Sequence, residues 1–384
     1  MKHSTPQSAD IAMSLDSVVS EAGQAAVRAS SFDDNELIRT AAKVTRDLNA
    51  VNPLIYWADF LASIVVGYGA MVAAIMFEAP GFAVLAGIVS VLALYRAGSF
   101  IHELTHIRRG SLPGFRFMWN ALLGVPLLLP SFMYEGIHNL HHARTRYGTT
   151  EDPEYLPLAL MKPYTVPLFV LVSVLAPLGL LIRYAILSPL SLIIPPLRKV
   201  VVERYSGLII NPEFRRRPPE GAFKKQWYAQ EIAASIWAIA LITAVITGFL
   251  PLRAFLIILA IVSGAIVLNQ IRTLVAHLWE NDGEVMSVTE QYLDSVNVPP
   301  PALLPALWAP VGLRYHALHH LLPGVPYHAL GEAHRRIAKA LPAGTTYYRA
   351  NHTSLWSLVA NLVRGSAGHT EAIAAANRPA GTAS

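Results

Sequence analysis

The chain has 384 residues and a formal net charge of +5, and only 14% of its residues are charged. Soluble globular proteins carry about 25% charged residues, so this chain has too little charge to cover a water-exposed surface, and we expect much of that surface to face lipid. Cysteine is absent, which excludes disulfides, thiolate zinc sites, iron–sulfur clusters and cysteine nucleophiles. The basic residues lie between apolar segments, so no nucleic-acid partner is expected.

The first predicted unit is a polar N-terminal segment, residues 1–50. It contains no apolar run typical of a cleavable signal peptide. We expect this segment on the cytoplasmic side, with a short polar helix within residues 33–50.

Four apolar stretches then predict two transmembrane helical hairpins. The second member of each pair is shorter than the roughly 20 residues that span a bilayer. Each continues in helix-compatible sequence past one arginine, Arg96 or Arg272, to a histidine, His102 or His277. These arginines can extend to the membrane interface. The stretches cover residues 60–77, 82–95, 232–250 and 254–268.

The segment 164–197 is apolar but rich in proline, and we interpret it as interfacial or re-entrant. A single crossing would place the histidines before it and those after it on opposite sides of the membrane. Arginine and lysine gather on the histidine side, so the positive-inside rule predicts that this side is cytoplasmic. Residues 351–384 end in small and polar residues and predict a largely disordered tail. The predicted fold is therefore an all-α integral membrane protein, with four transmembrane helices in two hairpins, interfacial helices and a cytoplasmic helical cap.

Three histidine clusters carry the strongest functional signal. They are H-x-x-x-H at His102, and H-x-x-H-H beginning at His138 and again at His316. Histidines three or four residues apart share one face of a helix, so each cluster is expected to point its imidazoles in one direction. Two copies of H-x-x-H-H are not expected by chance in a chain with 14 histidines, which makes the set specific. The clustered residues are His102, His106, His138, His141, His142, His316, His319 and His320.

Eight clustered imidazoles predict two metal ions. One transition-metal ion takes about four to six ligands, so two ions with about four nitrogens each fit the set. Neutral imidazole suits iron, zinc and copper, and His277 is the candidate ninth ligand. Nearby acids are candidates to accept hydrogen bonds from these rings. They are Glu103, Glu135, Asp152, Glu154, Glu280 and Asp294.

The order and placement of these clusters resemble the three histidine boxes of the membrane fatty acid desaturase and hydroxylase superfamily. The resemblance extends to His320-Leu-Leu-Pro-Gly-Val-Pro-Tyr-His328 and covers roughly residues 55–350. It implies a membrane catalytic domain over residues 51–350, with a non-haem di-iron centre at the cytoplasmic face and O2 as co-substrate. Carried over by position, the iron ligands would be the eight clustered histidines and His277.

The resemblance also implies the reaction and the partners. It favours O2-dependent desaturation of a lipid acyl chain held in a slender tunnel, with hydroxylation of a lipid as the alternative. The cytochrome b5 signature His-Pro-Gly-Gly is absent, and without cysteine there is no built-in ferredoxin or rubredoxin. A separate electron donor of ferredoxin, rubredoxin or cytochrome b5 type is therefore implied. The basic residues within 198–225 could bind an acidic donor or anionic membrane lipid. The lack of a signal peptide or retrieval motif favours a bacterial inner membrane.

Two rival interpretations stay open. His102-Glu103-x-x-His106 also fits the zinc-protease motif H-E-x-x-H, with Glu103 as general base, although such a site uses one metal and leaves most of the clustered histidines unexplained. A metal transporter would place its ligands near the bilayer midplane, whereas these clusters lie beside charged sequence. Metal content distinguishes the three. The oxygenase should hold two irons per chain, the protease one zinc, and the transporter a variable, exchangeable metal.

Overall fold

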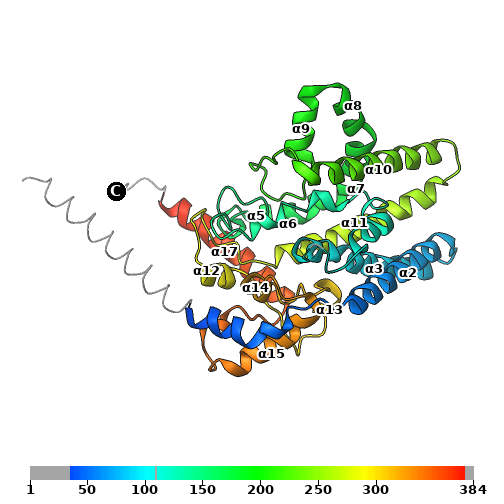
Figure 1. The fold of residues 1–384 in the computed structure, drawn as a ribbon. Coiled ribbons are helices and arrows are strands. Elements are labelled where there is room, and N and C mark those ends of the chain that lie inside the picture. Colours follow the sequence, from blue (N-terminus) through cyan, green and yellow to red (C-terminus); the bar gives the residue numbers. More distant parts are fainter. Residues whose placement is uncertain (1–34, 109, 377–384) are drawn as a thin grey trace, which may run out of the picture.

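A computed structural model describes residues 35–108 and 110–376, and every regular element in these residues is helical (Figure 1). Extended residues there form only isolated β-bridges. The predicted all-α class is confirmed. After a helix at 35–45, the α-helices are α2 Pro53–Met76, α3 Pro80–His106, α4 Phe115–Trp119, α5 His138–His141, α6 Thr165–Leu171, α7 Ala176–Ile182, α8 Ser188–Ile193, α9 Pro195–Tyr205, α10 Gly221–Ile246, α11 Leu252–Leu274, α12 Val288–Asp294, α13 Pro305–Trp308, α14 His316–Leu321, α15 Leu330–Ala340, α16 Thr346–Arg349 and α17 Leu355–Ala376.

Five of the described helical segments are long and apolar enough to cross a membrane. They are α2, α3, the segment Thr165–Ile193, α10 and α11. Figure 1 shows α2, α3, α10 and α11 extending to one side of the molecule, with α12, α14, α15 and α17 on the other. These four candidate membrane-spanning helices therefore lie apart from a second group of helices, α12, α14, α15 and α17, which we call the cap.

The first predicted hairpin is formed by α2 and α3. Asn52 caps α2 by accepting hydrogen bonds from the next residues, and a proline occupies the first turn of each helix, where no backbone donor is needed. The two helices approach closely at Gly67, where an added Cβ would lie 2.6 Å from Leu94 Cδ2. Ser90 Oγ donates to the Gly67 carbonyl at 2.8 Å. The helix α3 continues past Arg96 as predicted and so carries the first histidine cluster.

The second predicted hairpin is only partly realised. A short turn joins α10 to α11, but α11 packs mainly on α3 and on the proline-rich segment Thr165–Ile193. Ser263 Oγ, midway along α11, donates to the Val174 carbonyl of that segment at 2.8 Å. Pro177 and Pro189 each start a new helical piece there, because proline cannot continue a helix hydrogen-bond ladder. The resulting bends let the segment pack on both α10 and α11.

The N-terminal helix at 35–45 packs on the cap. Leu37 and Ala41 are buried against Leu318 and Leu330, which belong to α14 and α15. Just after the helix, Asp47 pairs with Arg336 at 2.6 Å. The described part of the N-terminal segment therefore stabilises the region that carries the third histidine cluster, whereas the predictions for residues 1–34 lie outside the described residues.

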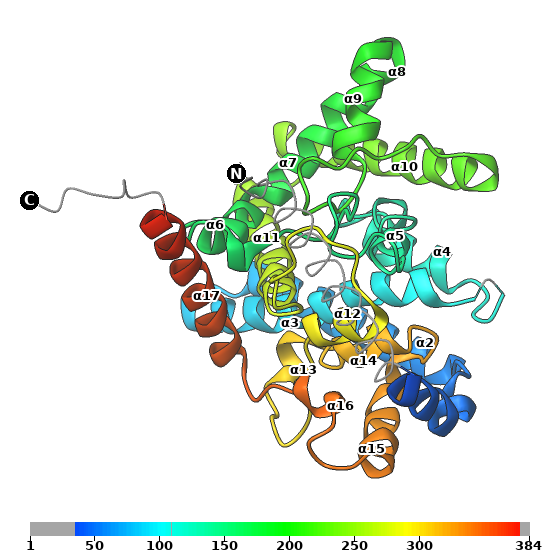
Figure 2. The same ribbon diagram turned by 90° about the vertical axis from the view of Figure 1, so that its left-hand side faces the viewer.

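The prediction of a largely disordered tail over 351–384 is wrong for Leu355–Ala376, which form α17 (Figure 2). The helix buries Leu358 and Leu362. Ser366 Oγ donates to the Met161 carbonyl, and Gly365 lies beside Ala159, where an added Cβ would make an ordinary contact at 3.8 Å. Small residues favour helix when such a face is buried, and the composition alone did not reveal the packing partner.

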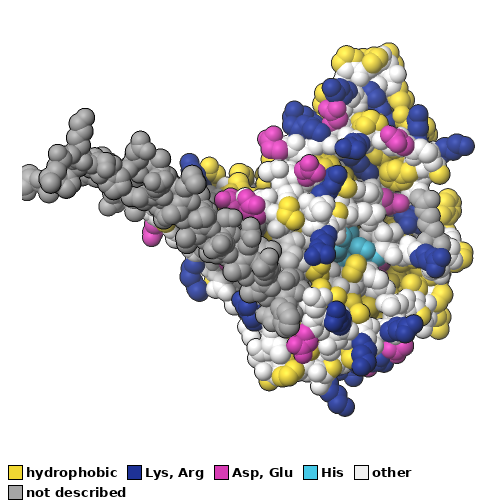
Figure 3. All heavy atoms as spheres, turned by 60° about the vertical axis from the view of Figure 1, so that its left-hand side comes forward, with side chains coloured by type: hydrophobic (Ala, Val, Ile, Leu, Met, Phe, Trp, Pro, Cys, Tyr) yellow, Lys and Arg dark blue, Asp and Glu magenta, His cyan; other side chains and the backbone are white. Residues whose placement is uncertain are grey.

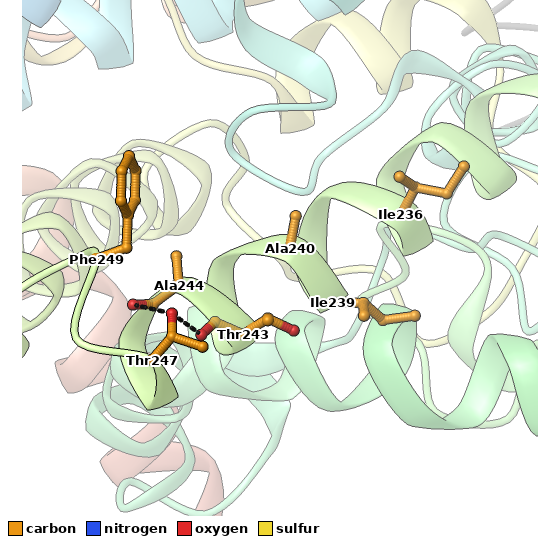
Figure 4. A pocket seen from close by; sticks show the side chains of 7 residues that line it. All are labelled: Ile236, Ile239, Ala240, Thr243, Ala244, Thr247 and Phe249. Atoms are coloured by element: carbon orange, nitrogen blue, oxygen red, sulfur yellow. Dashed lines mark hydrogen bonds between the residues drawn. The ribbon is translucent and has the colours of Figure 1, made fainter.

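A shallow apolar groove of about 620 Å³ runs along α10 and its following turn (Figure 4). It contains no titratable side chain, and we assign it to the lipid-facing surface rather than to a reaction site. Its lining residues are Ile236, Ile239, Ala240, Thr243, Ala244, Thr247 and Phe249.

Candidate metal centre

Four segments bring histidines together on the cap side of the membrane helices. The last turns of α3 carry His102 and His106, α5 and the residue after it carry the second cluster, and α14 carries the third. Figure 3 shows histidine side chains reaching the surface on this side among lysine and arginine side chains. The boxes, which are far apart in sequence, therefore form one site.

His277 follows the end of α11 and is held by a short extended pairing. The Leu278 N–H donates to the Asp294 carbonyl at 2.7 Å, and the Val296 N–H donates to the Ala276 carbonyl at 2.9 Å. The same segment also contacts α14, because the Ala317 N–H donates to the Val296 carbonyl at 3.2 Å, so the pairing places His277 beside the third box.

The nine predicted histidines form two groups, each with potential ligand atoms within 4.8 Å of one another. In each H-x-x-H-H box, the first and last histidines join one group and the middle histidine joins the other. A common direction for all imidazoles of a box would assign each box to a single group. Instead, each H-x-x-H-H box is divided between the two groups. The five-histidine group contains His102, His106, His138, His142 and His319, and the four-histidine group contains His141, His277, His316 and His320.

Ring nitrogens converge in both groups at the spacing of two ligands of one ion. Two nitrogens bound at about 2.0–2.1 Å and at right angles lie about 3 Å apart. The Nε2–Nε2 distances are 3.0 Å for His138–His142, 3.1 Å for His106–His319, 3.1 Å for His277–His316 and 3.2 Å for His316–His320.

The electrostatic state of these rings also fits metal binding. Burial holds the pKa of His138, His316 and His320 well below the usual range, so the rings are neutral and each offers a lone pair. Both ring nitrogens of His102 are buried without a hydrogen-bond partner in the described residues. A nitrogen-only donor set of this size fits two transition-metal ions such as iron.

Carboxylates orient the second box. His141 Nδ1 donates to Asp152 Oδ2 at 2.9 Å, and Asp152 also accepts two backbone N–H groups at 2.8 Å each. Glu154 lies 3.1 Å from His138 Nδ1 and accepts the Tyr134 hydroxyl at 3.0 Å. Burial raises the pKa of Glu154 to about 7. Carboxylates in this position fix the imidazole tautomer so that Nε2 keeps its lone pair.

A tyrosine links His277 to its carboxylate. The Tyr147 hydroxyl donates to Asp294 Oδ2 at 2.7 Å and lies 2.8 Å from His277 Nδ1. Tyr155 donates to the other oxygen of Asp294 at 3.1 Å. Burial raises the pKa of Asp294 to about 6. Sequence reasoning missed these tyrosines because Tyr147 and Tyr155 have no fixed spacing to a box.

The six predicted acids divide into those near a histidine and those away from one. Asp152, Glu154 and Asp294 orient histidines as described, and Glu103 Oε1 lies 3.6 Å from His102 Nδ1. Glu135 instead pairs with Arg116 at 2.5 Å, and Glu280 is exposed.

The surroundings of Glu103 do not support the zinc-protease alternative. Its buried carboxylate accepts the Tyr56 hydroxyl and, at 3.2 Å, the Tyr327 N–H. A general base of such a protease must face a metal-bound water, whereas this carboxylate holds α2 and the post-box segment against α3.

The two arginines expected to extend to the interface behave differently. Arg96 pairs with Asp59 through Nε and Oδ1 at 2.6 Å. Arg272 is only 8% exposed and turns inward, with Nη2 3.2 Å from His316 Nδ1. That inward orientation follows from the packing of α11 on α3, which hydropathy does not report.

Comparisons with known proteins identify the family of the chain. The fatty acid desaturase family matches residues 79–352, a range that holds all nine histidines. The chain is 50% identical over 336 residues to a ceramide hydroxylase of Caulobacter vibrioides (strain NA1000 / CB15N), covering 88% of this chain and 95% of that protein. No solved structure matches the chain significantly. By the family match and this identity, the chain belongs to the fatty acid desaturase family.

Proposed function

We propose that this protein is a membrane-bound, non-haem di-iron hydroxylase of a ceramide-type lipid. The observation that carries the proposal is the pair of converging histidine groups, which offer nitrogen ligands to two ions. The 50% identity to a ceramide hydroxylase supports hydroxylation, the alternative at the sequence level, over the desaturation that the boxes favoured.

In this proposal His102, His106, His138, His142 and His319 hold one iron and His141, His277, His316 and His320 hold the other. Bound iron would let O2, two electrons and two protons convert a C–H bond to C–OH with release of water. The chain's own residues fix the orientation of the rings, because Asp152, Glu154 and Tyr147 each accept a hydrogen bond from an imidazole Nδ1–H.

The topology that fits this site has four crossings. His142 and His277 lie in adjacent groups and therefore on one side of the membrane, so an even number of crossings separates them. The helices α10 and α11 supply two crossings. The segment Thr165–Ile193 must therefore enter the membrane from the histidine side and return to that same side. Two contacts support this path. Its middle touches the middle of α11 at Ser263, and its later part returns to Glu231 near the start of α10, where Arg183 pairs at 2.9 Å.

The electron donor in this proposal is a separate protein that docks on the cytoplasmic side. The basic run offers Arg217, Lys224 and Lys225 as exposed side chains. Arg216 is buried and donates to the carbonyl of Glu135 at 2.7 Å, so it does not contribute to docking. Figure 3 shows further basic side chains around the histidines. A bacterial inner membrane is the proposed location.

The test is metal analysis of the purified protein together with mass spectrometry of lipids from cells that make ceramide and express the chain. We expect two irons per chain and a ceramide gain of sixteen mass units, because a bound metal supplies this kind of O2 chemistry. A loss of two mass units would make the protein a desaturase, and one zinc with unchanged lipids would contradict the proposal altogether. The variant H319A, expressed at the same level as wild type, controls for hydroxylation by enzymes of the host cell.

A further inference from the structure

Arg272 is a buried cation at the candidate metal centre. It lies in the last turn of α11 and is 8% exposed. Its Nε is buried without a hydrogen-bond partner, and the one side-chain atom at hydrogen-bond distance from its guanidinium in the described residues is His316 Nδ1, 3.2 Å from Nη2. An arginine has five N–H donors and no acceptor, so most of its capacity is unused.

Among the described residues no carboxylate forms an ion pair with this guanidinium, and Glu154 feels its charge only from beyond ion-pair distance. Glu154 and Asp152 are engaged with histidines, Asp294 accepts two tyrosine hydroxyls, and Glu103 accepts Tyr56. A buried, unpaired charge is strongly unfavourable, so a partner from outside the chain is expected at this place.

The contact with His316 brings two donors together. His316 Nε2 faces its group, 3.1 Å from His277 Nε2. A ring that binds metal through Nε2 keeps its proton on Nδ1 and donates it to an acceptor, as His141 does toward Asp152. Arg272 cannot accept this proton. One oxygen with two lone pairs could accept from both donors at once, and their 3.2 Å separation allows ordinary hydrogen bonds to each.

We infer that Arg272 and the Nδ1–H of His316 together bind the acyl carbonyl oxygen of an N-acylated lipid substrate. This inference rests on the proposed function, because it uses His316 as a metal ligand. A carbonyl oxygen offers two lone pairs and no donor, and it belongs to the part of a ceramide-type lipid that joins head group and chain. Arg272 is then a substrate-positioning residue.

The position of the carbonyl determines which carbon is oxidised. Nδ1 and Nε2 are on opposite sides of one imidazole, so the carbonyl is held one ring away from the four-histidine group. The C–H bond nearest the metals is therefore within a few bonds of the carbonyl, and the new hydroxyl is expected there rather than in the middle or at the end of the acyl chain.

The test uses the purified full-length, iron-loaded protein with wild-type sequence and the variants R272Q, R272K and R253Q. Arg253 is an exposed arginine at the opposite end of α11 and serves as the matched control. The probes are a ceramide and its thioamide analogue, whose sulfur is a weaker acceptor. The readouts are iron content, equilibrium binding of each probe, KM and kcat, and the position of the hydroxyl by fragmentation.

For R272Q we expect two irons per chain, a KM and Kd for ceramide raised about tenfold to a hundredfold, and hydroxyl positions spread over neighbouring carbons. Wild type should prefer ceramide over the thioamide, R272Q should lose that preference, R272K should be intermediate, and R253Q should match wild type.

Unchanged ceramide binding and an unchanged product in R272Q would overturn the inference, and so would loss of iron in R272Q with normal lipid binding. Binding separates this inference from the proposed function. If ceramide binds in an Arg272-dependent way but is not hydroxylated by wild type, the proposed function fails and the carbonyl site stands. If ceramide is hydroxylated equally well by wild type and R272Q, the proposed function stands and the carbonyl site fails.

Discussion

The hydroxyl of Tyr147 lies 2.8 Å from Nδ1 of His277, across 130 residues of sequence, and donates a hydrogen bond to Asp294 at 2.7 Å. Both rings are buried. The phenol accepts the imidazole N–H, so His277 is held as the tautomer whose Nε2 lone pair faces the four-histidine group. Such outer contacts control metal affinity as well as ring orientation.

Replacing Tyr147 by phenylalanine removes the nearer acceptor for His277 Nδ1–H and leaves only Ser295 Oγ, at 3.2 Å, while keeping the ring. We expect iron affinity of the four-histidine group to fall about tenfold to a hundredfold, measured by competition with a chelator. The matched control is Y155F, since Tyr155 contacts the same Asp294 but no histidine nitrogen. Equal iron affinity in Y147F and wild type would show that the contact between Tyr147 and His277 does not affect metal binding.

One substitution in either group should stop turnover. H141A removes a nitrogen from the four-histidine group and H319A one from the five-histidine group, and two ions are needed for the proposed chemistry. We expect no detectable product and reduced iron, with membrane insertion intact. H334A is the control, because His334 contacts Tyr347 outside both groups. Product formation by H141A or H319A would refute the ligand assignment.

Glu231 pairs with one buried and one half-buried arginine and should matter for stability. Arg183 pairs with one of its oxygens at 2.9 Å and Arg198 with the other at 2.8 Å. E231Q leaves both arginines without a carboxylate, and breaking a buried pair costs about 3–5 kcal/mol, so the Tm in detergent should fall clearly. In contrast, K199A breaks only an exposed pair with Glu203, which is worth at most about 1 kcal/mol. Similar Tm values for both variants would contradict the role of Glu231.

Removing the metal should destabilise the cap. The two groups bring together the nitrogens of nine imidazoles, six buried and three half-buried, and an ion that binds only the folded state adds about 2.7 kcal/mol when free metal is a hundred times its Kd. We expect chelation to lower the Tm and abolish turnover. Fe(II) should restore both, whereas Zn(II) should restore only the Tm. A Tm that is insensitive to chelation would argue against a metal at these groups.

The sequence predicted what is local and missed what depends on tertiary packing. The nine histidines were found because i, i+3 and i+4 spacing is visible in the chain, and α2 and α3 because apolar length is visible. The division of each box between two groups could not be predicted, since it depends on how α5 and α14 face each other. Tyr147 and the inward turn of Arg272 likewise depend on neighbours far away in sequence. The helix α17 was missed because its burial against Met161 and Ala159 is a long-range contact.

The interleaving of the second and third boxes has a consequence for biosynthesis. Translation delivers His102 early and His320 late, and neither group is complete before residues 316–320 are made. The membrane helices α2, α3, α10 and α11 all precede the third box in the chain, so they enter the lipid bilayer before a full ligand set exists. In the proposed function a complete ligand set for iron can therefore form only after the third box has been made, and a chain truncated before α14 would lack ligands of both ion sites rather than one.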